Sequence, residues 1–314
     1  MIFSYLKTKT SMVNSTSQNT YNSCPLTHEE ADALLRKVNP QVADNSFDHS
    51  DTATIKQMIE GLGDTRGMTR LGFAEALGKV GQPAVSFLVD ALQNHPNVVV
   101  QRAAAKTLNL IGDPSTVPVL INSFLTDEDQ VVRNSCIGAL AGIGEVSVPP
   151  LLEILADSES DETIKGHAAW ALSFIGAKAK EPLYEALTSE VPEVRSAVVA
   201  AIAKIVEEYP EERGFQSITK ALQDPSQNVR SEAAAVLGNL KYQPAIPHLV
   251  PLLSDSEAEN RKMAALSLMK IGDCNSLEPL QAALNQETDS HIEKIIKLAI
   301  SQLEQQIETD DDDW

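Results

Sequence analysis

The chain has 314 residues and a formal net charge of −19, because 44 Asp and Glu outnumber 25 Lys and Arg. Hydrophobic residues make up 43% of it and aromatic residues only 4%, a composition that suits closely packed helices better than sheets. A strongly acidic chain repels phosphate backbones, so we expect no nucleic-acid binding.

The N-terminal residues 1–25 are rich in Ser, Thr and Asn and show no apolar period, so we expect this segment to be disordered. It has neither the apolar run nor the cleavage pattern of a signal peptide. No run in the chain approaches the roughly 18 apolar residues that a membrane-spanning helix needs. We therefore expect no membrane span.

Residues 26–50 are predicted to form one helix followed by a connector. In "LTHEEADALLRKV", Thr27 and Glu30 have the spacing of a capping box, which marks the start of a helix. The apolar side of this helix would consist of Ala31, Leu34, Leu35 and Val38.

A repeat with a period near 32 residues occupies the next part of the chain. Seven segments share one apolar pattern: RLGFAEALGKVG (70–81), QRAAAKTLNLIG (101–112), RNSCIGALAGIG (133–144), KGHAAWALSFIG (165–176), RSAVVAAIAKIV (195–206), RSEAAAVLGNLK (230–241) and RKMAALSLMKIG (261–272). A diverged eighth copy is EKIIKLAISQLE (293–304). A fixed period with one helical pattern per copy is typical of a solenoid.

A second apolar segment precedes these copies, as in "TVPVLINSFLT" and "SVPPLLEILAD", often with Pro in its first turn. Each repeat is therefore predicted to be a helical hairpin that buries its apolar face against its neighbours. The predicted fold is an all-α, right-handed α-solenoid superhelix over residues 51–305. The acidic residues 306–314 are predicted to be a solvated tail that packs poorly.

Aligned copies separate the faces of the second helix of each hairpin. We number positions from the first residue of each copy, position 0. Positions +3, +4, +7 and +10 are almost all apolar, which is helical periodicity and predicts the buried side. At +7 the residues are Leu77, Leu108, Leu140, Leu172, Ile202, Leu237 and Leu268.

The three cysteines are far apart in the sequence and include no CxxC pair, so they predict neither a zinc site nor a disulfide framework. Cys136 occupies position +3, where most other copies carry Ala, and is predicted to be a small core residue. Cys274 lies in a loop and Cys24 in the polar N-terminal segment. We expect no metal site and no nucleophile among them.

Positions +1, +5 and +9 form a mixed stripe on one face of the second helix. The stripe becomes aromatic in one central copy, at Trp170 and Phe174. Second helices usually line the concave side of a superhelix, so these rings are predicted to point into a groove, with space left by Gly138, Gly142 and Ala200. The alternative is that Trp170 only fills a local packing gap. His167, at +2, is interpreted as structural, although it borders the groove.

Position 0 carries a cation in most copies, including Arg133, Lys165 and Arg195. One interpretation is a ladder between repeats, in which these cations bond acidic turn residues such as Asp127, Asp129, Glu193 and Asp224. The alternative is that some of them, with Arg102 and Lys106, bind carboxylates of a ligand at the rim of the groove.

The motifs "ALxxIG" and "VPxLxxxL" resemble short HEAT-like repeats over roughly residues 51–305. "GDTRGMTRLGFAEALGKVG" (63–81) and "GHAAWALSFIG" (166–176) resemble more narrowly the E/F clan of phycobilin lyases of cyanobacteria and red algae. The resemblance implies a cytoplasmic or stromal protein that holds a linear tetrapyrrole, a phycobilin, and a phycobiliprotein subunit, with or without a second lyase subunit. It implies no tightly bound cofactor, because the phycobilin is the substrate.

In such a lyase a cysteine of the subunit adds to the chromophore, so no nucleophile is required here, and the resemblance assigns no catalytic residue. Two non-catalytic alternatives remain. One is a HEAT-repeat scaffold or chaperone for phycobiliproteins, and the other is an adaptor for phycobilisome degradation. The sequence shows no metal cluster, phosphate loop or catalytic triad that would separate these classes.

Overall fold

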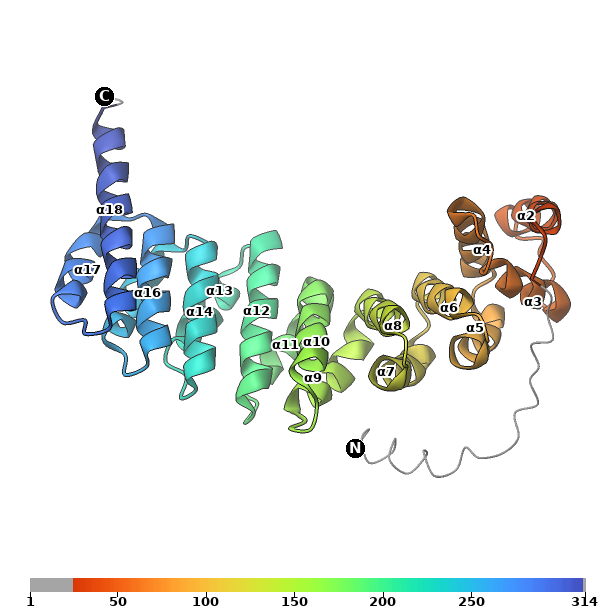
Figure 1. Ribbon diagram of the computed structural model, residues 1–314, viewed down its shortest axis with the longest axis horizontal. Coiled ribbons are helices and arrows are strands. Elements are labelled where there is room, and N and C mark those ends of the chain that lie inside the picture. The colour runs from red at the N-terminus through yellow and green to blue at the C-terminus, as the bar shows by residue number, and fades with distance from the viewer. Residues whose placement is uncertain (1–24, 313–314) are drawn as a thin grey trace. The chain divides into compact units, whose positions relative to one another are not determined.

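The computed structural model describes residues 25–312, with side chains described through residue 306. Within this range all regular structure is helical, and the chain is an all-α solenoid in which helices follow one another as hairpins (Figure 1). The disorder expected for residues 1–25 falls, apart from Pro25, outside the described residues. Between residues 25 and 312 no helix is long and apolar enough to cross a membrane.

The helices divide into two compact units. Unit 1 extends through Ile154 and includes Glu159–Ala171, and unit 2 consists of Leu155–Ser158 and the chain from Leu172 onward. The elements of unit 1 are α2 (His28–Ala43), α3 (Thr52–Gly61), α4 (Gly67–Val80), α5 (Gln82–Asn94), α6 (Val98–Ile111), η1 (Pro114–Thr116), α7 (Val117–Thr126), α8 (Gln130–Ile143) and η2 (Glu145–Ser147). The division between the units falls within α9 (Val148–Ala156) and α10 (Glu162–Ile175).

Unit 2 continues the same hairpin pattern. Its elements are η3 (Gly176–Ala179), α11 (Lys180–Ala186), α12 (Pro192–Glu208), α13 (Glu212–Ala221), α14 (Gln227–Asn239), η4 (Gln243–Ala245), α15 (Ile246–Leu249), η5 (Val250–Ser254), α16 (Ala258–Ile271), η6 (Cys274–Ser276), α17 (Leu277–Leu284) and α18 (Ser290–Asp312). The diverged eighth copy lies in α18, which continues past residue 305 to Asp312. The right-handed sense of the superhelix stays a prediction.

Helix α2 begins at the predicted capping box. The Thr27 side chain accepts a hydrogen bond from the Glu30 backbone, and the Glu30 carboxylate accepts one from the Thr27 backbone. The helix then packs against α4, and Arg66 forms an ion pair with Asp32 of α2 at 2.9 Å. Helix α2 thus packs on the first hairpin through α4.

The glycine of "IG" ends most second helices because it adopts a backbone conformation that other residues avoid. Gly81, Gly112, Gly144, Gly176 and Gly272 all have positive φ angles. The copy in α12 has Val206 at this place, and its helix continues to Glu208. In the copy of α14, Lys241 takes the same role as the glycine at a φ of 50°.

The predicted core positions are confirmed. Every residue at positions +3 and +7 of the seven copies, from Phe73 to Leu268, has zero exposure. Position +10 is less uniform than expected, because Ile111, Ile143 and Leu240 are half-buried. Consecutive second helices lie against each other, as α4, α6 and α8 do in unit 1 and α12, α14, α16 and α18 do in unit 2, and in four of the seven copies the residue at +3 is Ala.

Helices α14 and α16 lie so close together that position 238, where they meet, requires glycine. A Cβ atom added to Gly238 would lie 2.7 Å from the Ser267 Cα, and backbone at that distance cannot move aside. The Ser267 hydroxyl donates a 2.7 Å hydrogen bond to the Ala234 carbonyl across the same contact.

We expect Gly238→Ala to lower the free energy of unfolding by about 1–3 kcal/mol through overpacking. The matched control is Gly138→Ala in α8, where an added Cβ meets nothing within 4 Å. This control is expected to be neutral or to gain about 0.5–1 kcal/mol from helix propensity. Denaturant unfolding of both variants measures the difference, and equal stabilities would contradict the close contact.

Candidate functional site

The mixed stripe lies at the surface of the second helices. Trp170 is 50% exposed, Phe174 60% and Leu110 56%, although all three are large apolar side chains. Trp170 and Phe174 are four residues apart in α10, so they lie one turn apart on one face of that helix. Trp170 belongs to unit 1 and Phe174 to unit 2.

The glycines of α8 differ in what surrounds them. Space is open at Gly138, where an added Cβ meets nothing within 4 Å. Gly142 was also expected to leave space, but that expectation is wrong, because the side chain of Asn109 in α6 fills the position. Gly166, one turn before Trp170, is open and was missed by the sequence argument. In unit 2, Ala200 is half-buried in α12.

The ring of His167 packs edge-on against Phe124 of α7, with 6.1 Å between ring centroids. His167 is half-buried, so the contact gives this histidine a structural role, as the sequence argument favoured. The contact also ties α10 to the preceding hairpin of unit 1.

The cations at position 0 form a ladder in unit 2. Arg195 donates two hydrogen bonds of 2.7 Å to the Asp224 carboxylate in the next turn, and a third to the carbonyl of Ser189 in its own turn. Arg230 binds Asp255 in the same way. The ladder interpretation is therefore correct for Arg195, whose side chain is only 12% exposed and serves the fold.

Two further contacts belong to the same ladder, although only one was expected. In unit 1, Arg102 replaces the uncharged Gln101 and binds Asp129, which the sequence argument had named. In unit 2, Arg261 binds Glu287, which that argument had not named. These contacts lower the pKa of Asp129 and of Glu287 to about 2, chiefly because an arginine hydrogen-bonds each carboxylate.

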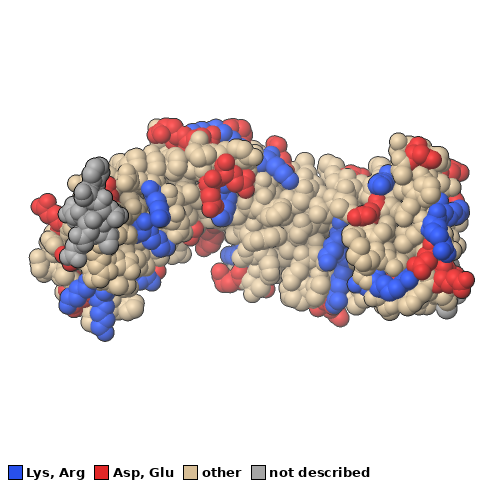
Figure 2. Space-filling model, turned by 90° about the horizontal axis from the view of Figure 1, so that it is seen from above, with Lys and Arg blue, Asp and Glu red and all other residues tan. Residues whose placement is uncertain are grey.

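Fewer cations in unit 1 remain for a ligand than the sequence suggested. In the part of the chain that the structure describes, no ion pair or side-chain hydrogen bond engages the ammonium groups of Lys106 and Lys165. Arg133 donates to Gln130, but its Nε is buried without an acceptor. On the face shown in Figure 2, Lys and Arg occur in small groups among acidic and uncharged residues, not as one continuous basic patch.

The described cysteines occupy the expected places. Cys136 is fully buried, and burial raises the pKa of its thiol to about 12, so the thiol stays protonated and serves as a core residue. Cys274 is exposed in η6. Cys24 lies outside the described residues. Among residues 25–312 no group of three His, Cys, Asp or Glu side chains is placed to hold a metal ion.

Sequence reasoning missed a polar network between α11 and α13. The Tyr184 hydroxyl donates a 2.6 Å hydrogen bond to Glu211, which also pairs with Lys180, and Arg213 lies 3.9 Å from the centroid of the Tyr184 ring. Burial, followed by the bond to Glu211, raises the pKa of Tyr184. These residues come from two hairpins, so no local sequence motif indicates the network. Together they join α11 to α13, which are the first helices of their hairpins.

Comparison with known proteins agrees with this architecture. The family model of HEAT repeats matches residues 55–141, 85–173, 148–213 and 215–301. The crystal structure of Kap121p shares the fold, with a TM-score of 0.53 at 14% identity over 90% of this chain and 38% of that one. The chain belongs to the HEAT-repeat family.

Two relatives indicate which group of HEAT-repeat proteins this chain is similar to. Over 279 residues the chain is 40% identical to the bilin biosynthesis protein MpeU of Synechococcus sp. (strain WH8020), covering 88% of this chain and 94% of the relative. It is 31% identical over 124 residues to the uncharacterized phycocyanin operon protein Z of Pseudanabaena tenuis (strain PCC 7409), covering 38% and 61%. The chain is a phycobilin lyase-like HEAT-repeat protein.

The ladder predicts a pH-dependent contribution to stability. We expect Glu287→Gln to lower the free energy of unfolding at pH 7 by about 1–3 kcal/mol, because Arg261 loses a charged acceptor. The folded-state pKa of Glu287 is depressed to about 2 from 4.5, so its contribution is complete above about pH 4.5 and is lost as the pH falls toward 2.

The measurement is chemical denaturation of wild type and variant between pH 7 and pH 2, with exposed Glu278→Gln in α17 as the control. The difference between wild type and Glu287→Gln should disappear at the acidic end, whereas the control should match wild type throughout. A difference that stays constant with pH would show that the ion pair is not its cause.

Proposed function

We propose that this protein is a phycobilin lyase-type protein. It binds a linear tetrapyrrole and a phycobiliprotein subunit on the surface of its second helices and promotes attachment of the chromophore to a cysteine of the subunit. The 40% identity to a bilin biosynthesis protein over most of both chains supports the class of substrate. The observation that carries the proposal within this chain is the exposed Trp170 on a helix surface that also offers open glycine positions.

Each part of the ligand matches a chemical feature of unit 1. A phycobilin has a flat conjugated body and two propionate groups. The indole of Trp170 offers an apolar face for the body, and the positions of Gly138 and Gly166 leave room beside the helices. Lys106 and Lys165 are the cations available for the propionates, whereas the Nε of Arg133 is buried and cannot reach a surface ligand. Arg102 and Arg195 are excluded from this role by their ion pairs.

The reaction requires no nucleophile from this chain. The cysteine sulfur of the subunit forms a bond to the vinyl or ethylidene carbon of the phycobilin. The thiol proton, or one that replaces it from solvent, goes to the chromophore, so the addition balances without an oxidant or reductant. The contribution of this protein is to hold both reactants in one orientation and to restrict the conformation of the phycobilin. We assign no catalytic residue.

A lyase of this kind requires a protein partner and a particular cellular compartment. Its partner is an apo-phycobiliprotein subunit, with or without a second lyase subunit. The phycobilin is a substrate that leaves with the subunit, so no cofactor stays bound. Phycobiliproteins are assembled in the cyanobacterial cytoplasm or the plastid stroma, and the proposal places this protein in the same compartment.

We expect Trp170→Ala to weaken phycobilin or subunit binding by about 1–3 kcal/mol, the scale of an aromatic anchor, while the thermal unfolding midpoint stays near that of wild type. Stability should hold because the indole is half exposed and the +3 and +7 contacts remain. Absorption titration with the phycobilin, subunit pull-down and thermal unfolding are measured on one preparation.

Tyr209→Ala is the matched control, since Tyr209 is a 63% exposed aromatic residue outside the stripe. It should bind like wild type. A collapse of stability in Trp170→Ala with unchanged binding per folded molecule would refute the proposed surface. Subunit binding by wild type without any chromophore uptake or transfer would instead favour a chaperone or degradation adaptor.

Lys106→Gln tests the carboxylate contact separately. If Lys106 binds a propionate, the variant should bind the phycobilin about 5- to 10-fold less tightly than wild type, and esterification of both propionates should weaken binding to wild type but not to the variant. Lys178→Gln, an exposed lysine of η3 outside the stripe, is the control. Equal losses on esterification in wild type and Lys106→Gln would remove Lys106 from the site.

A further inference from the structure

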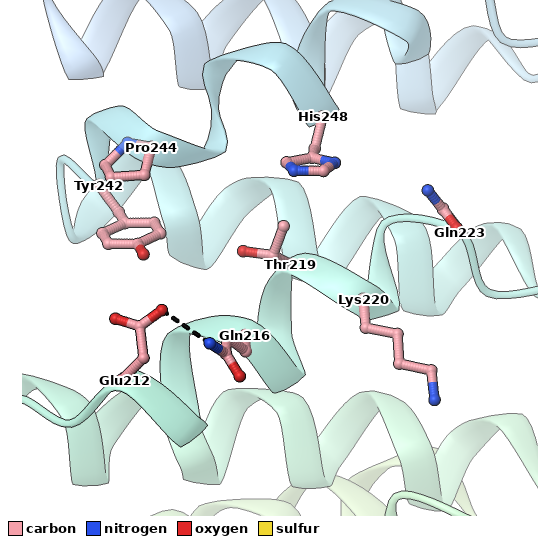
Figure 3. Close-up of a pocket in the computed structure, with 8 residues that line it drawn as sticks. All are labelled: Glu212, Gln216, Thr219, Lys220, Gln223, Tyr242, Pro244 and His248. Atoms are coloured by element: carbon pink, nitrogen blue, oxygen red, sulfur yellow. Dashed lines mark hydrogen bonds between the residues drawn. The ribbon is translucent and has the colours of Figure 1, made fainter.

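Unit 2 contains a cleft that the proposed function does not use. It lies between α13 and the segment from Tyr242 to His248, and has a volume of about 400 Å³ (Figure 3). Gln216 and Lys220 of α13 line one wall, and Pro244 belongs to the other. All lining residues come from this unit.

The cleft exists because the first helix of this hairpin is broken. Its only α-helical part is α15, with four residues, whereas α13 has ten. Pro251 has no backbone N–H, so a continuous α-helix would lose a hydrogen bond here, and the 3-10 turn η5 follows α15 directly. The hairpin departs from the repeat where the cleft opens.

Several polar side chains of the cleft have no protein partner. The Thr219 hydroxyl is buried without a hydrogen bond. Among the described residues, no side-chain hydrogen bond or ion pair engages Lys220, Gln223 or His248 either. The bond drawn in Figure 3 joins Gln216 to Glu212 at 2.9 Å and leaves the Gln216 carbonyl available. The buried Thr219 hydroxyl, with these polar side chains around the cleft, favours a polar occupant.

The opposite wall offers a rigid apolar surface. The Tyr242 ring stacks on Phe215 with 4.0 Å between centroids and 10° between planes, so its position is fixed. Pro244 lies beside it, and both face the cleft (Figure 3). One wall is therefore polar, and the other presents the apolar surfaces of Tyr242 and Pro244 beside the imidazole of His248, which suits a ligand whose groups alternate between two sides.

The spacing along α13 matches an extended polypeptide. At a rise of 1.5 Å per residue, Glu212, Gln216 and Lys220 follow one another at about 6 Å. Side chains on one side of an extended chain recur at roughly 6.6–6.8 Å. Glu212 and Lys220 are about 12 Å apart along the axis, near the roughly 13 Å between residues i and i+4 of an extended chain.

We infer that this cleft binds an extended segment of a partner polypeptide. The segment carries a basic residue opposite Glu212 and an acidic residue, four positions away, opposite Lys220. Gln216, Thr219 and Gln223 hydrogen-bond its main chain or small polar side chains, because an amide side chain can both donate and accept. The residues between the two charges place apolar side chains against Tyr242 and Pro244.

The test uses two fluorescein-labelled peptides with blocked ends, Lys-Val-Thr-Val-Glu and Glu-Val-Thr-Val-Lys, titrated with the full chain and followed by anisotropy. Wild type is expected to bind one order at least tenfold more tightly than the other. The charge-reversed double variant Glu212→Lys with Lys220→Glu is expected to prefer the opposite order. Thr219→Val should weaken binding without loss of stability, because the hydroxyl it removes has no protein partner.

Lys294→Glu, on the exposed side of α18, is the matched control for charge and should bind like wild type. The inference is overturned if wild type binds neither peptide at millimolar concentration, or if charge reversal leaves the preference unchanged. Displacement of the peptide by free phycobilin would also overturn it, because the cleft would then be a chromophore site. None of these outcomes depends on whether the protein is a lyase.

Discussion

The contact between consecutive second helices is the interaction on which the rest of the structure depends. A single hairpin cannot bury its own apolar face, so each relies on the side chains at +3 and +7, all of which are fully buried. Consecutive second helices lie against each other, and at Gly238 the approach excludes even a methyl group. Because these positions carry the core, several of the +1, +5 and +9 positions, such as Trp170 and Phe174, remain at the surface and can vary with function.

The basic residues fall into two groups: those that join two hairpins through an ion pair, and those whose charge is open to a ligand. An arginine at position 0 that reaches a carboxylate in the next turn is committed to joining two hairpins, as Arg195 and Arg230 are. A lysine without such a partner can form an ion pair with a carboxylate of another molecule. In a chain with net charge −19, Lys106 and Lys165, which no ion pair engages among the described residues, are therefore more informative about a ligand site than the arginines.

Much of the fold could be predicted from the sequence, because period, core positions and closing glycines are local signals that repeat. The predicted capping box at Thr27 is present for the same reason. The site could be predicted only in part. Asn109 fills the space at Gly142, and Asp255 and Glu287 complete the ladder, through contacts between hairpins that no single copy encodes. The cleft beside α15 depends on Pro251, which interrupts a helix that the repeat pattern predicts to be continuous.

The central claim is that the surface around Trp170 receives the phycobilin. The chain has two tryptophans, Trp170 and Trp314, so Trp314→Phe leaves Trp170 as the sole indole emitter. Titration of this variant with phycobilin, followed by indole fluorescence and chromophore absorption together, tests contact directly. The account predicts strong quenching that saturates with the absorption change, and weaker quenching when Gly166→Leu fills the open position one turn before Trp170. A saturating absorption change with undiminished Trp170 emission would contradict it.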